Sequence, residues 1–259
     1  PPDPTEMSAS LGCSVATNAS CARTFRFGPT RDWVRAIRVM TMTGEVLDIP
    51  RGKYFSSPAG WFTVYDEKGG CYPVRVPDYQ MPRTKNTAGF YASPHMDLAD
   101  LFIGSEGAFG IITTVDVALL AWQPKCSIIL FTDSDERALH LVEALRSDKR
   151  LKLDFLEFYS TNAMDLLRDM QAGDARHTGM PPIPVSVGAA VFFDVGFDPL
   201  IEKPDFSALE EATASAGVCL GDSWAGYEQR ELSRFKAFRH LLPEKIGQVI
   251  SERKKTYPD

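Results

Sequence analysis

The sequence predicts an α+β protein made of two parts, residues 1–123 and 124–259. In the first part, β-branched and alternating apolar runs are separated by long irregular stretches. In the second part, strand-like and helix-like patterns alternate four times, and no glycine-rich phosphate-binding turn follows the first strand. This order favours a sheet covered by helices over a dinucleotide-binding fold. The pattern changes near Trp122–Lys125, which places the boundary there.

The first part is expected to contain three strands and one short helix. The strands are predicted at residues 34–42, 43–49 and 111–121. Residues 97–104 fit a short helix that Gly104 ends. Residues 50–82, rich in Gly, Pro, Tyr and Phe, are expected to form one long irregular segment, and such a loop is usually functional or covers another part of the domain.

The second part is expected to form four strands, each followed by a helix. The predicted strands are residues 126–132, 151–160, 185–196 and 218–225, and the predicted helices are residues 133–149, 161–171, 205–217 and 227–255. We expect the helices to lie on one face of the sheet, and strand 185–196 to be buried on one face.

Composition excludes several classes of protein. The chain has 259 residues, 44% of them hydrophobic, which is enough to bury a core. A net charge of -6 and a pI of about 5.3 argue against general nucleic-acid binding. No run of about 18 apolar residues occurs, and no signal sequence opens the chain. We therefore expect a cytoplasmic protein with, at most, a peripheral association with a membrane.

The cysteines and histidines give no indication of a disulfide or a metal site. The five cysteines are widely spread without a C-x-x-C pair, and the four histidines have no ligand spacing. These patterns predict reduced thiols and no metal site. The chain begins with Pro-Pro-Asp-Pro rather than methionine, from which we expect a piece of a longer polypeptide.

The most informative stretch is residues 8–32, which packs small residues, amides and hydroxyls into one run. Its small residues leave backbone N–H groups open to an anion, and its side chains add neutral hydrogen-bonding groups. The small residues are Gly12, Ala16, Ala19 and Ala22, and the hydrogen-bonding side chains are those of Ser10, Thr17, Asn18 and Ser20. Such a run suits a pyrophosphate or a flat ring; the alternative is a tightly packed turn of small residues.

Two further stretches are candidates for ligand contact. Residues 104–113 place three glycines before a β-branched strand, which brings backbone close to a ligand or, alternatively, forms a helix C-cap and a turn. In residues 83–90, Lys85 and Asn86 are candidates to face a substrate; the alternative is a solvated loop.

In their order and spacing, these stretches resemble the FAD-linked oxidases of the vanillyl-alcohol oxidase and p-cresol methylhydroxylase (PCMH) superfamily, in the branch of the glycolate oxidase D subunit and D-lactate dehydrogenase. The matching segments are Pro1–Thr5, Leu11–Asp32, Lys85–Phe90 and Leu101–Thr113. The sequence departs from the family pattern at Cys13 and Cys21, where the family has glycines, and at Ala108–Phe109. The cysteines would crowd a ligand unless the backbone suits a side chain there, and a redox role for the pair is the alternative.

The resemblance implies that residues 1–123 are the second subdomain of a PCMH-type FAD-binding domain whose first subdomain is missing. Residues 124–259 would be a ferredoxin-like α+β cap domain, incomplete at its C-terminus. The implied reaction is oxidation of a 2-hydroxy acid such as glycolate or D-lactate by hydride transfer to FAD. As in glycolate oxidase assemblies, the resemblance implies an iron–sulfur protein as the electron-transfer partner; the chain has no cysteine cluster for such a centre of its own.

Three further expectations accompany this resemblance. Loss of the first subdomain would uncover apolar surface, so we expect self-association. One alternative is a catalytically inert fragment, or a split subunit that needs a partner with the pyrophosphate-binding loop. Another alternative is an FAD-dependent enzyme similar to the ether-lipid synthases.

The resemblance also implies the site residues. FAD would be bound by Pro2, Asp3, Ser10, Gly12, Cys13, Ala16, Thr17, Asn18, Ala19, Gly107, Gly110, Ile111 and Ile112. Residues 234–244 resemble a family helix with a Trp-x-x-Arg pattern, with Phe235 where tryptophan is common. On that match Arg239 would bind the substrate carboxylate bidentately, together with Lys85 and Asn86. The alternative for Arg239 is a surface salt bridge. In this branch a catalytic histidine follows the cap, and here it would lie beyond Asp259 or be absent, so we predict no catalytic base in this chain. His240 is not assigned that role, because adjacent positions on a helix point apart.

Overall fold

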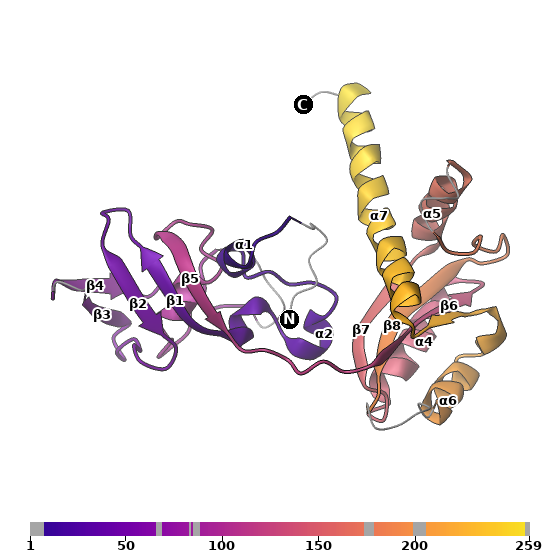
Figure 1. The fold of residues 1–259 in the computed structure, drawn as a ribbon, viewed down its shortest axis with the longest axis horizontal. Coiled ribbons are helices and arrows are strands. Elements are labelled where there is room, and N and C mark those ends of the chain that lie inside the picture. Colours follow the sequence, from indigo (N-terminus) through magenta and orange to yellow (C-terminus); the bar gives the residue numbers. More distant parts are fainter. Residues whose placement is uncertain are drawn as a thin grey trace. The chain divides into compact units, whose positions relative to one another are not determined.

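The computed structural model of the chain describes residues 8–65, 69–82, 84, 89–173, 179–198 and 206–256. The chain divides into two compact units, Pro1–Ala121 and Trp122–Asp259 (Figure 1). Each unit combines helices with antiparallel strands, so the predicted α+β class is confirmed. Across the described ranges, no helix is both long and apolar enough to cross a membrane.

The first unit is built on a three-stranded antiparallel sheet with the order β2–β1–β5. β1 spans Val34–Met40, β2 spans Val46–Pro50 and β5 spans Ile111–Val117. The three predicted strands therefore exist with shorter bounds. β1 and β2 are joined by a tight turn in which Gly44 has a φ of 88°, a conformation that a glycine adopts without strain.

The expectation of one irregular segment over residues 50–82 is wrong, because this segment contains a β-hairpin. β3 spans Trp61–Tyr65 and β4 spans Cys71–Arg75, and the two strands pair antiparallel. Phe62 and Val64 are buried while the residues on either side of them are exposed. This alternation is short, and the surrounding glycines and prolines favour a loop reading.

Short helices complete the first unit. They are α1 (Leu11–Ala16), α2 (Thr24–Phe27), the 3₁₀ helix η1 (Thr30–Trp33) and α3 (Ala99–Phe102). Val15 of α1 packs into one core with Val39 of β1, Phe62 of β3 and Leu101 of α3. The opening stretch is thus anchored by helix packing, and α3 lies inside the predicted helix 97–104.

The second unit has one four-stranded sheet with the order β7–β8–β6–β9, and all neighbours are antiparallel. Its elements are β6 (Lys125–Thr132), α4 (Asp135–Ser147), β7 (Leu153–Tyr159), α5 (Thr161–Gly173), β8 (Ala189–Gly196), α6 (Ser207–Ser215), η2 (Leu220–Asp222), β9 (Trp224–Gly226) and α7 (Gln229–Thr256). The predicted alternation of strands and helices is confirmed. Ser134 caps α4, since its side chain accepts from the backbone N–H of Arg137.

Helices cover both faces of this sheet, which corrects the expectation of one covered face. Leu141 of α4 and Leu209 of α6 pack with Val191 of β8 on one face. On the other face, the ring of Phe235 in α7 lies 5.8 Å from that of Phe192. β8 is consequently buried along its whole length rather than on one face.

The strand expected over residues 218–225 is also shorter than predicted. A 3₁₀ turn, η2, occupies Leu220–Asp222, and the strand β9 has only three residues. The Ser223 hydroxyl donates to the carbonyl of Leu220 at 2.5 Å, which closes the turn. This local bond competes with an extended backbone, as serine side chains often do.

Candidate functional site

The small-residue stretch begins as a capped helix. The Ser10 hydroxyl accepts a hydrogen bond from the backbone N–H of Cys13 at 3.1 Å, which caps α1. At the other end, the backbone N–H groups of Thr17, Asn18 and Ala19 donate to carbonyls within α1. These three amides therefore serve the local fold, whereas the sequence suggested an open series of amides. Gly12 lies in the first turn of α1, and the Ser10 and Thr17 residues are exposed.

Asn18 makes the chain reverse after α1. Its φ is +46°, a left-handed conformation that asparagine tolerates better than most residues. Its side-chain oxygen accepts from the backbone N–H of Arg31 at 3.0 Å. The carbonyl of Ala19 accepts from both the backbone N–H and the hydroxyl of Thr30, at 3.2 and 2.8 Å. Residues 8–32 therefore fold back on themselves as one structural piece.

The two glycine-containing stretches lie side by side, although they are far apart in the sequence. The backbone N–H of Gly104 donates to the carbonyl of Val15 at 3.1 Å, and that of Glu106 donates to the carbonyl of Ala16 at 2.9 Å. Gly104 has a φ of +84°. The structure thus brings Ala16, Asn18 and the start of the 104–113 stretch into one place.

The three glycines of the 104–113 stretch differ in what surrounds them. Gly104 is packed against Asn18, and a Cβ on Gly110 would lie 2.5 Å from the carbonyl oxygen of Met40. Gly107 has a φ of +83°, but a Cβ built there meets nothing within 4 Å. Gly104 and Gly110 are thus explained by packing within the unit, while Gly107 leaves backbone open to an approaching ligand.

Ile111 and Ile112 begin β5 just after these glycines. Ile111 is 58% exposed, and Ile112 is half-buried against the core. Because successive side chains of a strand point to opposite faces, the side chain of Ile111 points toward solvent and that of Ile112 points toward the core.

Cys13 and Cys21 adopt ordinary backbone conformations. The non-glycine residues with positive φ, over the ranges that the structure describes, are Asn18, His95 and Glu106. A Cβ at either cysteine is therefore compatible with the backbone. Cys13 is exposed and Cys21 is half-buried, and neither takes part in a disulfide.

A charged network that the sequence did not reveal supports this region. Arg31 donates to the Asp100 carboxylate at 2.7 Å and to the carbonyl of Ile103 at 2.5 Å. Arg51 donates to the same Asp100 oxygen at 3.0 Å. The side chains of Arg31 and Asp100 are only 12% and 13% exposed. One carboxylate, that of Asp100, is thus shared by two guanidinium groups.

The signal for this network in the sequence is faint. Arg31 closes the opening stretch and Asp100 lies in the predicted helix 97–104, but nothing in their spacing pairs them. The guanidinium carbon of Arg31 also lies 4.2 Å from the centre of the Tyr91 ring. The arginine is therefore held by a carboxylate, by carbonyls and by an aromatic face.

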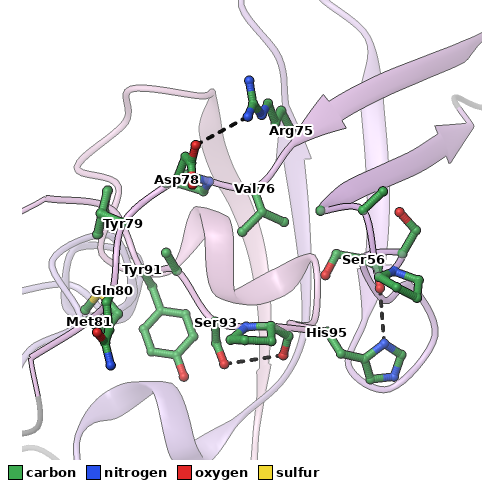
Figure 2. A pocket seen from close by; sticks show the side chains of 17 residues that line it. Ser56, Arg75, Val76, Asp78, Tyr79, Gln80, Met81, Tyr91, Ser93 and His95 are labelled. Carbon is green, nitrogen blue, oxygen red and sulfur yellow. Dashed lines mark hydrogen bonds and ion pairs between the residues drawn. The ribbon is translucent and has the colours of Figure 1, made fainter.

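A hollow of about 1040 Å³ lies beside Tyr91, between the base of the β3–β4 hairpin and residues 91–95 (Figure 2). At its rim, Arg75 and Asp78 form an ion pair at 3.4 Å. His95 has a φ of +53°, and its Nδ1 lies 3.1 Å from the carbonyl oxygen of Ser56. None of the predicted cofactor residues lines this hollow, so we assign it no part in that site.

Four of the predicted site residues lie outside the described residues. These are Pro2 and Asp3 at the start of the chain, and Lys85 and Asn86 in the 83–90 stretch. Their placement contributes nothing to the site as built. Over the same described part of the chain, no group of three His, Cys, Asp or Glu side chains could hold a metal ion.

Arg239 is held within the second unit by a protein carboxylate. From α7, its Nε and Nη2 donate to the two carboxylate oxygens of Glu157 in β7, both at 2.8 Å. The Arg239 side chain is 12% exposed, so this pair is largely buried rather than a surface salt bridge. Tyr159 donates from its hydroxyl to Glu157 at 3.3 Å. Burial, and then the charge of Glu157, raises the pKa of the Tyr159 hydroxyl well above its ordinary value.

The chain is similar to several curated proteins, although no protein-family model matches it. It is 33% identical over 130 residues to a D-lactate dehydrogenase of Anaerostipes hadrus, which covers 50% of this chain and 20% of the relative. It is 22% identical over 247 residues to a D-2-hydroxyglutarate dehydrogenase of Stutzerimonas stutzeri, which covers 93% of this chain and 42% of the relative. The chain thus spans less than half the length of the curated relatives it matches.

A solved structure shares the fold. An alkyldihydroxyacetonephosphate synthase matches 93% of this chain and 40% of its own, with a TM-score of 0.53 and 12% sequence identity. At this identity the likeness concerns the fold alone.

Proposed function

Since this chain is a relative of the FAD-linked oxidases of the vanillyl-alcohol oxidase and p-cresol methylhydroxylase superfamily, we propose that it is part of an FAD-dependent oxidoreductase. The intact protein would oxidise a 2-hydroxy acid of the glycolate or D-lactate type. The sequence relatives are named as dehydrogenases of such acids, D-lactate and D-2-hydroxyglutarate.

The observation that carries the proposal is the meeting of the two motif stretches. The bonds from Gly104 to Val15 and from Glu106 to Ala16 join them. Gly107 then presents open backbone beside the helix α1, in a conformation that a side chain would strain. Open surroundings at a positive φ also occur at Gly44 in the β1–β2 turn, so what points to a cofactor is the place of Gly107 beside the two joined motif stretches.

The chemical types of these residues suit FAD. The surface combines exposed hydroxyls, open backbone at Gly107 and an apolar side chain at Ile111, which together suit a polar chain and a flat ring. The proposed cofactor residues of the described ranges are Ser10, Gly12, Cys13, Ala16, Thr17, Asn18, Ala19, Gly107, Gly110, Ile111 and Ile112. Gly110 would act by allowing β5 to start close to β1. When bound, FAD supplies the ring that accepts the hydride.

We propose that the first unit is the second subdomain of a PCMH-type FAD-binding domain and that the second unit is the cap domain. The strand order β7–β8–β6–β9 supports the cap assignment, because it is the order of a ferredoxin-like split βαβ arrangement. In this reading α4 and α6 are the two standard helices, and α5 and α7 are additions on the opposite face. Arg239 would bind the substrate carboxylate, with Lys85 and Asn86 as further candidates.

A titration of this chain with FAD tests the proposal. Flavin fluorescence and absorbance should show saturable binding. Gly107→Ala should weaken that binding, because the new methyl group occupies the space where the cofactor approaches. Gly44→Ala is the matched control, since Gly44 also has a positive φ and open surroundings but lies in the β1–β2 turn. Equal affinity of both variants for FAD would contradict a cofactor at Gly107.

Two other functions remain as outcomes of that titration. If no FAD binds, the chain is better described as an inert fragment or a split subunit that needs a partner with the pyrophosphate-binding loop. If FAD binds, activity on an acyl-dihydroxyacetone phosphate but not on hydroxy acids would indicate an enzyme similar to the ether-lipid synthases. The shared fold with alkyldihydroxyacetonephosphate synthase is the observation behind this second candidate.

Two partner proposals follow from the same function. An iron–sulfur protein would receive the electrons, as the resemblance to glycolate oxidase assemblies implies; such a centre would lie on the partner, since the sequence has no cysteine cluster for it. Self-association of this chain is proposed because Leu11, Phe25 and Ile111 of the first unit are 46–58% exposed. Sedimentation across micromolar concentrations tests it, and a monomer throughout would contradict it.

A further inference from the structure

We infer that Glu157 competes with the substrate for Arg239, as an internal carboxylate that must leave before an external one can bind. This inference rests on the proposed role of Arg239 in the intact oxidoreductase. It adds Glu157 of β7 as the residue that controls access to the guanidinium group of Arg239 on α7.

Arg239 holds Glu157 in the same two-point geometry by which an arginine binds the carboxylate of a ligand. Arg239 presents its Nε and Nη2 edge, and the two oxygens of Glu157 accept from it at 2.8 Å each. This two-point arrangement is the one by which arginine recognises any planar carboxylate. A substrate carboxylate aligned on the same edge would occupy the positions that Glu157 holds.

The two partners are not equally fixed. The Arg239 side chain is 12% exposed, and its guanidinium carbon lies 5.6 Å from the centre of the Phe155 ring. Glu157 is 27% exposed and lies on β7, the edge strand of the sheet (Figure 1). The carboxylate therefore has the easier path to water, and it is the partner that would move. The Tyr159 hydroxyl, at 3.3 Å, is the group that restrains it.

The charges favour replacement of Glu157 by the substrate carboxylate over binding of both carboxylates to Arg239 at once. Arg239 and Glu157 together are neutral, so a second carboxylate beside them would meet one cation and one anion. Two carboxylates on one largely buried guanidinium repel each other. Removing Glu157 alone would take the carboxylate away from the Nε and Nη2 edge of a largely buried guanidinium group, which is costly and which a small anion can relieve. A substrate carboxylate is such an anion.

The experiment uses ¹⁵N-labelled chain and the NMR signal of the Arg239 Nε–H group. Sodium acetate and sodium D-lactate are the probes, titrated at constant ionic strength. In the Glu157→Gln variant, the apparent affinity of both carboxylates at Arg239 should rise by about tenfold or more over the unchanged chain. The glutamine amide keeps the size of the side chain but carries no charge that competes.

The Arg38–Asp48 pair provides the matched control. Arg38 also holds a carboxylate with two bonds, both at 2.7 Å, but the side chains are 48% and 55% exposed. Water already solvates this arginine, so Asp48→Asn should create no comparable carboxylate site. A similar gain at Arg38 would show that any vacated arginine responds, and it would overturn a special role for Arg239.

Two results contradict the inference directly. One is equal carboxylate affinity at Arg239 with and without Glu157; the other is no binding in either protein. If Glu157→Gln does not fold, Tyr159→Phe decides, because it removes only the hydroxyl that restrains Glu157. Tighter carboxylate binding in Tyr159→Phe supports the inference and unchanged binding overturns it. The titration with FAD measures cofactor binding by the first unit at Gly107, whereas the NMR titration measures carboxylate binding at Arg239. A failure of the proposed function can therefore be distinguished from a failure of this inference.

Discussion

Gly104 packs against Asn18 where the two motif stretches meet. A Cβ added to Gly104 would lie 3.1 Å from the Cβ of Asn18, tighter than nearly all real contacts of this kind. Both residues have positive φ, +84° and +46°. The backbone reverses at each residue, and the two reversals fit together only because one of them carries no side chain.

We therefore predict that Gly104→Ala destabilises the first unit by about 2 kcal/mol, because it adds both strain and a crowded contact. Gly44→Ala has nearly the same φ but meets nothing within 4 Å, so it should cost about 1 kcal/mol. Urea unfolding followed by tryptophan fluorescence measures the difference. Equal costs would mean that the contact with Asn18 contributes nothing beyond the strain.

A second prediction concerns Asp100, which accepts from both Arg31 and Arg51. Asp100→Asn removes the charge between two guanidinium groups in a largely buried place, and we expect a loss of about 3 kcal/mol in the free energy of unfolding. Asp48→Asn, at an exposed ion pair, is the comparison and should have little effect. Similar small effects at both sites would show that the Asp100 network is well solvated.

A third prediction concerns the thiol of Cys126, which is 4% exposed at the start of β6. Burial, opposed only partly by a backbone hydrogen bond, raises its pKa from 9.0 to about 11. About one thiol in a thousand is then ionised at pH 8, and the thiolate is the reactive form. Cys13, Cys71 and Cys219 are exposed and should react with a disulfide reagent at once.

The measurement is a thiol count in native and in urea-unfolded protein. Cys126→Ala should leave the native count unchanged at early times and lower the unfolded count by one. A lower native count would show that Cys126 is accessible. The raised pKa also means that the neutral thiol contributes stability at pH 9 and below, which is lost as the pH rises towards 11.

The strands and the long helices could be predicted from the sequence because their hydrophobic patterns are local. The apolar runs at 34–42 and 126–132 and the capped helix after Ser134 can be recognised from neighbouring residues alone. The β3–β4 hairpin was not predicted, because five-residue strands flanked by glycines and prolines have the sequence pattern of a loop. The second covered face of the sheet was missed because it depends on where α5 and α7 pack, which no local pattern records.

The site divides in the same way. Its motif residues could be found by resemblance, and so could the likeness of Arg239 to a substrate-binding arginine. Its supporting charges could not, since Asp100 lies 69 positions from Arg31 and Glu157 lies 82 positions from Arg239. Ion pairs between distant segments are set by the packing of the elements that carry them, and composition gives no hint of the pairing.

A fourth prediction concerns Pro243, which lies inside the 28-residue helix α7. Proline has no N–H, so it cannot donate to the carbonyl of Arg239 one turn earlier, and its ring crowds that carbonyl. Pro243 is exposed, so no core packing compensates for the lost bond. Pro243→Ala should therefore raise the free energy of unfolding of the second unit by about 2 kcal/mol.

Gly247→Ala is the matched control for this change, because Gly247 lies one turn later in the same exposed part of α7 and a Cβ there meets nothing within 4 Å. It changes only the helix propensity and should stabilise by about 1 kcal/mol or less. Urea unfolding of both variants separates the two effects. A larger gain for Pro243→Ala than for Gly247→Ala is expected, because only the proline change restores a hydrogen bond. If Pro243→Ala destabilises the unit instead, Pro243 is part of how α7 places Arg239 against Glu157.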